Sequence, residues 1–218
     1  MRPPRAVSAE IEILTPGQIQ TVLKGLWGSS IYPVAVTALG MGMRRGELLA
    51  LRWQDVDLDA ARVRVEQSLE QTKVGLRIKE PKTKYGRRTI TLPASVITEL
   101  RAHWKAQQER RLSLGLGKAP EETLVFATLD GKPRSPNAFT KEWSVTMREL
   151  GLKVTFHALR HTHASQLIAS NLDVLAISRR LGHSTPAITL SVYGHLLSNS
   201  DDQAARVIET AFSLAHTD

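Results

Sequence analysis

Two arginines, two histidines and one tyrosine in this chain are of the types that can cleave a phosphodiester without a metal. Guanidinium groups grip phosphate oxygens through a planar fork of N–H donors. A phenol, with a free pKa of about 10, becomes a nucleophile only beside a base and cations that stabilise the phenolate. The five side chains are Arg44 in GMRRGEL, His157 and Arg160 in FHALRHT, and His183 and Tyr193 in LGHSTPAITLSVYGH.

Each pair of neighbours also has a plainer explanation. Arg44 and Glu47 are three residues apart on an expected helix, so they can form an ordinary ion pair, or Glu47 or Asp55 can orient Arg44 toward phosphate. His157 and Arg160 also share a face at a helix start, where backbone N–H groups favour anions. Considered alone, each pair favours the plainer explanation. The ordered combination favours phosphodiester chemistry.

The other histidines raise the question of a metal. His157 and His161 have the i, i+4 spacing of zinc-binding histidines, but no glutamate follows His157 as the short zinc-protease motif requires. We therefore expect no bound metal, and we expect His161 and His163 to be core or hydrogen-bonded structural histidines.

Composition narrows the class of protein. The 218 residues carry a formal net charge of +8, which favours a polyanionic partner such as nucleic acid. The absence of cysteine excludes disulfides, thiolate metal sites and a cysteine nucleophile. No apolar run reaches the roughly 18–20 residues that span a bilayer, and the polar start lacks a signal core, so we expect a cytoplasmic, nucleoid-associated protein and no membrane partner.

The elements that must position these side chains are mostly helical. Thr15-Pro16-Gly17-Gln18 predicts a capped helix start, and residues 31–51 predict helix interrupted near Gly40-Met41-Gly42. Alternation with period two predicts three strands of one small antiparallel sheet, with the turn 82–87 before the last strand. The fold class is thus α+β, mostly α, with a concave basic face around Tyr193. The expected strands are 62–66, 75–79 and 88–92, and the expected later helices are 94–112, 136–149, 157–169, 174–181, 186–197 and 203–214.

The chain resembles the catalytic domain of a known family, the tyrosine recombinases of the phage-integrase type. The matching stretches are MGMRRGELLALRWQDVDLD, PKTKYGRRTITLP, FHALRHTHASQLI and RRLGHSTPAITLSVYGHL, in the family's order. The resemblance covers about residues 14–200, after a leader or linker remnant at 1–13 and before a tail helix at 201–218. It implies a helical catalytic domain with a small three-stranded antiparallel sheet, here without the family's N-terminal DNA-binding domain.

The resemblance also implies a role for each residue. Arg44 and Arg160 resemble the phosphate-clamping arginines, and Tyr193 resembles the nucleophile that forms a 3′-phosphotyrosine and releases a 5′-hydroxyl. Lys82 resembles the general acid on the β-turn, with Lys84 as the alternative. The other resembling residues are His157 as acid/base, His183 as a hydrogen-bond donor to phosphate, and Glu47 and Asp55 as supporting acids.

The implied activity is site-specific DNA recombination or integration that needs no metal, ATP or other cofactor. The implied partners are double-stranded DNA and, at full length, other copies in a tetramer on two DNA sites, whereas this piece without DNA is expected to be a monomer. Two alternatives stay open: a type IB topoisomerase-like enzyme, and a DNA-binding regulator that has lost catalysis. The apolar side of the tail helix, which includes Ile208 and Phe212, is expected to pack on its own domain or on a neighbouring protomer.

Overall fold

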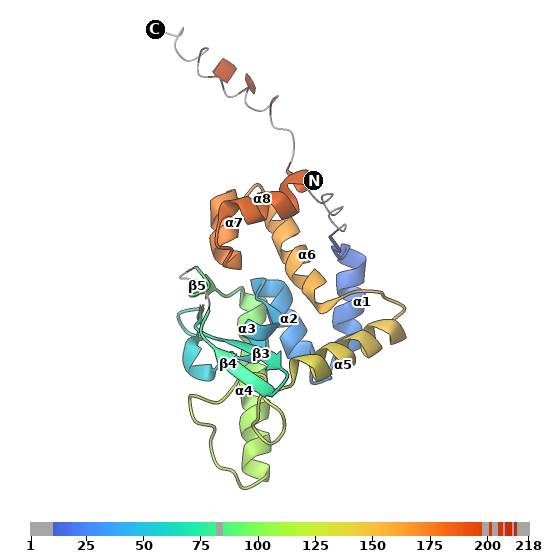
Figure 1. The fold of residues 1–218 in the computed structure, drawn as a ribbon, viewed down its shortest axis with the longest axis vertical. Coiled ribbons are helices and arrows are strands. Elements are labelled where there is room, and N and C mark those ends of the chain that lie inside the picture. The colour runs from blue at the N-terminus through green and yellow to red at the C-terminus, as the bar shows by residue number, and fades with distance from the viewer. Residues whose placement is uncertain are drawn as a thin grey trace.

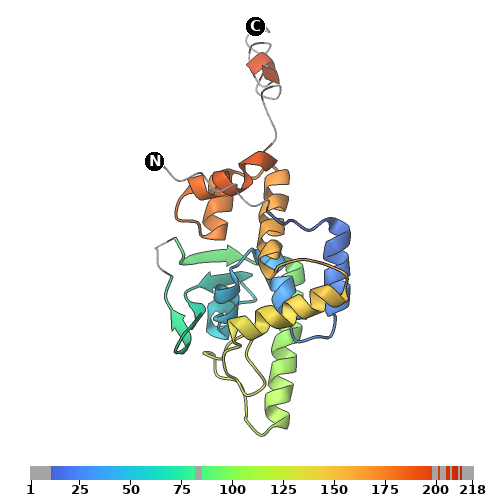
Figure 2. The same cartoon turned by 45° about the vertical axis from the view of Figure 1, so that its right-hand side comes forward.

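The computed structural model describes residues 11–81 and 85–197 and, in the tail, residues 201, 205, 206, 208–210 and 212. The expected general acid Lys82, its alternative Lys84 and most of the tail face lie outside these residues. The tail residues that the structure describes are helical. Figures 1 and 2 show the helical body and the small sheets from two directions. No helix among the described residues is long and apolar enough to cross a membrane.

Helices make up most of the described chain, and local signals fix their ends. Thr15 and Gln18 form the expected capping box at the start of α1, since each side chain accepts a hydrogen bond from the other residue's backbone N–H. Gly42, in the left-handed conformation, ends α2 and confirms the predicted interruption. The helices are α1 (Pro16–Leu26), α2 (Tyr32–Met41), α3 (Arg45–Leu49), α4 (Ala94–Ser113), α5 (Pro136–Glu149), α6 (Phe156–Ala169), α7 (Val174–Leu181) and α8 (Pro186–Tyr193), with short 3₁₀ turns at Trp53–Asp55 and Gly194–Leu196.

The strands form two small antiparallel sheets. One sheet has the order β1-β2-β5 and the other pairs β3 with β4. We expected one sheet made of residues 62–66, 75–79 and 88–92. This prediction is wrong for 75–79, which pairs with 68–72 in a separate sheet. A strand of mainly polar residues, Ser68–Thr72, gave no clear alternation, although only two residues separate it from its hairpin partner. The strands are β1 (Val56–Asp57), β2 (Arg62–Val65), β3 (Ser68–Thr72), β4 (Gly75–Lys79) and β5 (Arg88–Thr91).

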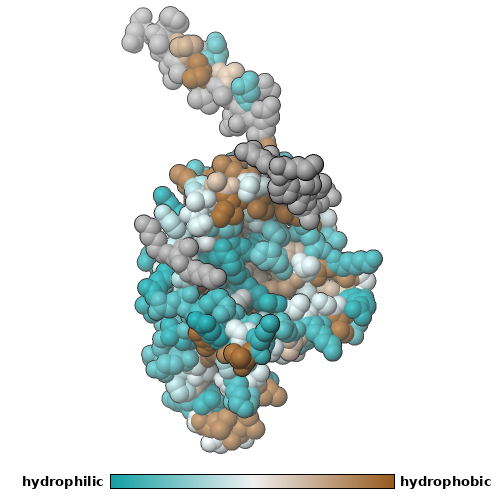
Figure 3. Space-filling view, viewed as in Figure 1, coloured by the Kyte–Doolittle hydropathy of each residue, from teal (hydrophilic) through white to brown (hydrophobic). Residues whose placement is uncertain are grey.

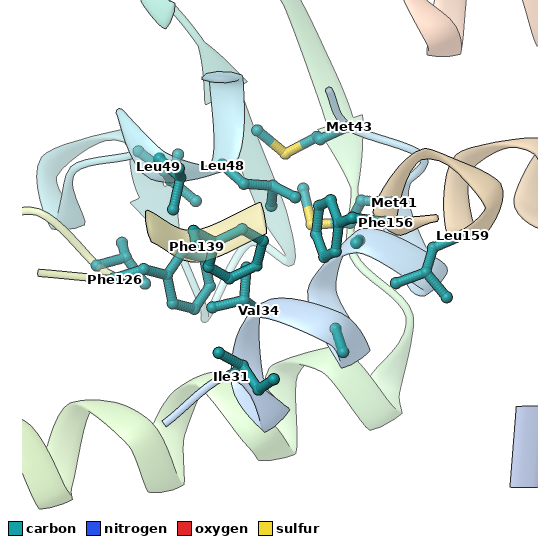
Figure 4. Packing of buried hydrophobic residues seen from close by; sticks show 14 of the residues in the cluster. Ile31, Val34, Met41, Met43, Leu48, Leu49, Phe126, Phe139, Phe156 and Leu159 are labelled. Atoms are coloured by element: carbon teal, nitrogen blue, oxygen red, sulfur yellow. The ribbon is translucent and has the colours of Figure 1, made fainter. Parts of the chain in front are cut away.

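The main core surrounds α2, which packs against α1, α3, α4 and α6. Figure 4 shows part of this core, where Met41, Leu48, Phe139 and Phe156 approach one another from α2, α3, α5 and α6. Burial of these apolar side chains is the main source of stability in such a fold. The core thereby fixes the start of α6 and the loop before α3, which carry the candidate arginines.

A second, smaller cluster lies beneath α7 and α8. It consists of Ala164, Ile168, Ile177, Leu181 and Tyr193, with Ile11 packed against it. The described end of the expected leader is thus in contact with the domain, and Glu12 also accepts hydrogen bonds from Thr155. The candidate nucleophile is itself a member of this small core.

Candidate active site

Three arginines converge on the C-terminal end of α7. The consecutive carbonyls of residues 180, 181 and 182 accept hydrogen bonds from Arg88 Nε at 2.7 Å, Arg160 Nη2 at 2.8 Å and Arg44 Nη2 at 3.0 Å, respectively. The last carbonyls of a helix lack partners within the helix and lie at the negative end of its dipole. The end of α7 therefore draws guanidinium groups from β5, α6 and the start of α3 to one place.

Glu47 is the counter-charge of this group. Its carboxylate accepts hydrogen bonds from Arg44 Nη1 at 2.9 Å, from Arg88 Nη1 at 3.1 Å and Nη2 at 2.8 Å, and from the Arg44 backbone N–H at 2.9 Å. Burial raises the pKa of Glu47, but the hydrogen bonds from Arg88 and the charges of Arg88 and Arg44 outweigh burial and lower it to about 2. Glu47 is therefore ionised near neutral pH and fixes two arginines at once.

The two candidate phosphate clamps differ in exposure. Arg160 is buried and its Nη1 also donates to the Gly42 carbonyl at 2.7 Å, whereas the Arg44 side chain is 41% exposed. Burial and the charge of Arg44 lower the pKa of Arg160, and Glu47 opposes them. A guanidinium has five N–H donors, and carbonyls take two of those of Arg160. Both arginines therefore keep donors that can serve an incoming anion.

Two glycines allow the backbone to approach these arginines. Gly42 and Gly182 have φ of 64° and 68°. A Cβ at Gly182 would lie 2.7 Å from Arg88 Nη1, and one at Gly42 would lie 2.5 Å from His163 Cδ2. Both positions thus favour glycine, because φ is positive and because a Cβ would collide with the side chain packed against it.

His183 follows Gly182 directly and is buried at the same end of α7. Its Nδ1 lies 2.8 Å from the Thr189 hydroxyl on α8. Burial, followed by the charges of Arg160 and Arg44, lowers the pKa of His183 to about 3. A neutral imidazole beside two guanidinium groups can donate or accept one hydrogen bond without adding charge.

Tyr193, at the end of α8, is 2% exposed, and its hydroxyl lies 2.8 Å from Nδ1 of His161. Burial raises the pKa of Tyr193, and the charge of Arg160 acts in the opposite direction. His157, one turn earlier on α6, places its ring edge-on to that of His161 with centroids 4.6 Å apart. His157 is exposed as a residue, but the protein partly desolvates its ring. This desolvation, together with the charges of His161, Arg160 and Arg44, lowers the pKa of His157 to about 4.

Most of the expected site residues are thus brought together. Arg44, Glu47, Arg160 and His183 meet at the end of α7, and charge effects link this group to Tyr193 and His157. The expectation that Asp55 orients Arg44 is wrong, because its buried carboxylate pairs with Arg52 at 2.7 Å and with Arg64 at 3.9 Å. Arg52 is three residues from Asp55 and captures the carboxylate locally.

Sequence reasoning missed two members of the site. Arg88 was assigned only to a strand, although alternation along β5 places it on the same face as buried Ile90. His161 was expected to be structural, yet its ring contacts the phenol. His163 is structural as expected, because its Nδ1 donates to the Leu39 carbonyl and its Nε2 accepts from Arg180 Nε. The signal for His161 was its i, i+4 spacing from His157.

Two further searches of the described residues bear on the site. They contain no group of three or more His, Cys, Asp or Glu side chains placed to hold a metal. A cleft of about 650 Å³ lies between the α1–α2 connection and α4. The candidate residues do not line this cleft, whose walls include Trp27, Tyr32, His103 and Arg134.

In this helical domain, arginines, histidines and a tyrosine from separate elements thus lie close together, and comparison with known proteins identifies the family. Residues 17–200 match the model of the phage integrase family. The chain therefore belongs to the phage integrase family.

Curated relatives agree with this assignment. A tyrosine recombinase XerC-like protein of Caldanaerobacter subterraneus subsp. tengcongensis is 30% identical over 96% of this chain and 57% of its own length. The integrase of Staphylococcus phage L54a is 32% identical over 81% of this chain and 50% of its own length. The chain spans about half the length of the curated relatives it matches.

Solved structures share the fold. The Tn1549 transposon integrase in complex with transposon right end DNA superposes with a TM-score of 0.76 at 23% identity, covering 94% of this chain and 67% of that one. XerA recombinase superposes with a TM-score of 0.65 at 21% identity, covering 96% and 66%. The expected fold class, a mostly helical tyrosine-recombinase catalytic domain, is thus confirmed, with the strand pairing corrected above.

Proposed function

We propose that this chain is the catalytic part of a site-specific DNA recombinase or integrase that cleaves and rejoins strands through a 3′-phosphotyrosine. The observation that carries the proposal is the convergence of Arg44, Arg160 and His183 on the end of α7, with Tyr193 near enough to Arg160 for the two charges to interact. Phosphoryl transfer needs positioned donors around the charged phosphate, and the fold supplies them from separate elements.

The proposed reaction has the following steps. Tyr193 Oη attacks the scissile phosphorus, the bond from phosphorus to the 5′-oxygen breaks, and that oxygen leaves with a proton. Arg44 and Arg160 offset the charge that develops on the non-bridging oxygens, and His183 hydrogen-bonds one of them. Lys82, or alternatively Lys84, is the proposed acid for the leaving oxygen, and His157 is the proposed acid/base near the nucleophile. Because a phosphotyrosine conserves the phosphodiester energy, the scheme includes no ATP, metal or other cofactor.

The proposed partner is double-stranded DNA. Several structural neighbours are described as complexes with DNA, and the net charge of +8 supports electrostatic binding. For the protein on DNA we propose a tetramer on two DNA sites, and for the 218-residue chain without DNA a monomer. A DNA substrate also implies a cytoplasmic, nucleoid-associated setting in a bacterial or phage system.

The test is trapping of a covalent adduct. The 218-residue chain is incubated with a pool of random-sequence duplexes, each nicked so that the short 5′-hydroxyl fragment diffuses away after cleavage. An adduct survives detergent and adds 24.1 kDa of protein to the labelled strand, and sequencing the trapped strands reveals the preferred site. Wild type is expected to be trapped, and Tyr193→Phe is expected to bind DNA without being trapped.

Tyr32→Phe is the matched control, since Tyr32 packs edge-on against Trp27 and lines the cleft that the candidate residues do not line. Adducts with Tyr193→Phe would disprove the nucleophile assignment. Binding by wild type without any adduct would favour the regulator, and supercoil relaxation without exchange between two duplexes would favour the topoisomerase-like alternative.

A further inference from the structure

The hydroxyl of Tyr193 lies at hydrogen-bond distance from a histidine in this structure, and that histidine is not the one that the family motif points to. Among residues 11–81 and 85–197, the hydrogen bond of the Tyr193 hydroxyl joins it to His161 Nδ1 at 2.8 Å, and the ring of His157 lies edge-on to that of His161. A general base must lie within hydrogen-bond distance of the group whose proton it removes. His161 meets this requirement.

The protonation state of His161 also suits a base. Burial and the charge of Arg160 lower the pKa of His161, whereas Glu12 acts in the opposite direction. The neighbouring ring of His157 has a lowered pKa as well, so the pair carries little positive charge near neutral pH. A neutral imidazole with its proton on Nε2 leaves the Nδ1 lone pair facing the phenol.

The surroundings of Tyr193 explain why a base is needed. The ring is buried against the small cluster, and its burial disfavours the phenolate. Arg160 favours the phenolate through its charge but offers no site for the released proton. Attack therefore requires an acceptor at the oxygen itself.

We propose that His161 is a catalytic residue whose Nδ1 takes the phenolic proton as Tyr193 attacks DNA, an inference that rests on the recombinase function proposed above. The proton passes from Oη to Nδ1, the Oη–P bond forms, and the bond from phosphorus to the 5′-oxygen breaks with its electron pair on that oxygen. The leaving oxygen takes its proton from a separate acid. On rejoining, His161 returns its proton to the phenol.

The first test needs no DNA. Nitrogen-15 NMR of the imidazole groups reports which ring nitrogen carries the proton. At neutral pH, His161 is expected to be neutral with its proton on Nε2, and Tyr193→Phe is expected to move its Nδ1 resonance. A His161 ring with its proton on Nδ1 in both proteins would overturn the inference, because that nitrogen could not accept.

The second test separates proton transfer from simple positioning. In His161→Asn the side-chain oxygen can replace Nδ1 as a hydrogen-bond acceptor, but it cannot hold the proton. On a nicked duplex carrying the trapped sequence, single-turnover adduct formation is expected to fall about 10²-fold or more in both His161→Asn and His161→Ala, as for loss of a general base. Added imidazole is expected to restore part of the rate of His161→Ala.

His195→Asn is the control, because His195 lies two residues after Tyr193 but is exposed. If His161→Asn reacts at the wild-type rate, His161 only positions the phenol and the proposed proton transfer is wrong. This outcome differs from failure of the proposed function, in which wild type itself forms no adduct.

Discussion

The arginine side and the tyrosine side of the pocket are held in place differently. On the arginine side, Arg44 and Arg88 share the carboxylate of Glu47. Arg44, Arg88 and Arg160 each donate to one of three consecutive carbonyls at the end of α7. On the tyrosine side, the phenol has a hydrogen bond to His161, and His183 has one to Thr189. The charge-binding half is therefore part of the fold's polar framework, while the nucleophile is held by a small core and single polar contacts.

The surface reflects the same difference. Figure 3 shows hydrophilic side chains over the middle of one face, and apolar side chains near α7 and α8 and at the far end of α4. Exposed apolar residues around α7 and α8 include Leu175 and Leu190. A region with exposed apolar groups and a small core is expected to be less stable locally than the main core. We therefore expect substitutions on the arginine side to lower stability strongly, and substitutions on the tyrosine side to affect activity more than stability.

The largest effect is expected for Arg160→Met. The change removes a proposed phosphate donor and leaves the Gly42 and Leu181 carbonyls without their hydrogen bonds from Arg160 in a buried site. Each buried unpaired group costs about 1–3 kcal/mol, so the loss of two hydrogen bonds should lower the free energy of unfolding by about 2–6 kcal/mol in urea titrations. Adduct formation should fall at least about 10²-fold. The same change at exposed Arg179 should leave the free energy of unfolding nearly unchanged, and equal losses at both positions would break the comparison.

Glu47→Gln should produce a loss that depends on pH. The folded pKa of Glu47 is lowered from 4.5 to about 2, so the unfolded chain binds more protons between these values and stability rises with pH there. The contribution, about 3 kcal/mol at most, is present above pH 4.5 and is lost as pH falls through about 2.

The measurement for Glu47 is the difference in free energy of unfolding between wild type and Glu47→Gln across pH 2 to 7. We expect the difference to be constant above the unfolded pKa and to shrink below it. Glu149→Gln, at an exposed position, serves as control. A difference that stays constant down to pH 2 would show that the pairing of Glu47 with Arg88 and Arg44 does not lower its pKa.

Gly182→Ala tests whether α7 ends where the arginines need it. Gly182 and Gly151 have similar φ values of 68° and 71°, but only at Gly182 would a Cβ meet another side chain. Alanine at Gly151 should cost about 1 kcal/mol from backbone conformation alone. Gly182→Ala should cost more, because Arg88 is fixed by Glu47 and cannot move away freely. Equal thermal denaturation of the two variants would show that the arginine contact is not constraining.

How much of this could be read from the sequence differs between local and distant features. The ends of α1 and α2 and the shared face of His157 and Arg160 follow from spacing within one turn. The binding of Arg88 to Glu47 joins distant segments, and charge alone does not give the partner. Two local features were missed for other reasons: the polar strand β3 shows no clear alternation, and more than one arginine was available to the carboxylate of Asp55.

The smallest effect on stability is expected for Thr189→Val, on the tyrosine side. Valine keeps the shape of buried Thr189 but removes the hydroxyl that contacts His183 Nδ1. Loss of one hydrogen bond should lower the free energy of unfolding by about 1 kcal/mol or less. The rate of adduct formation should fall by more than this loss of stability suggests. Among the hydrogen bonds of the described residues, Thr189 provides the one from α8 that fixes the His183 ring. Thr189→Ser, which keeps the hydroxyl, should restore the rate; a slow Thr189→Ser enzyme would show that the methyl group, and hence the small core, positions His183.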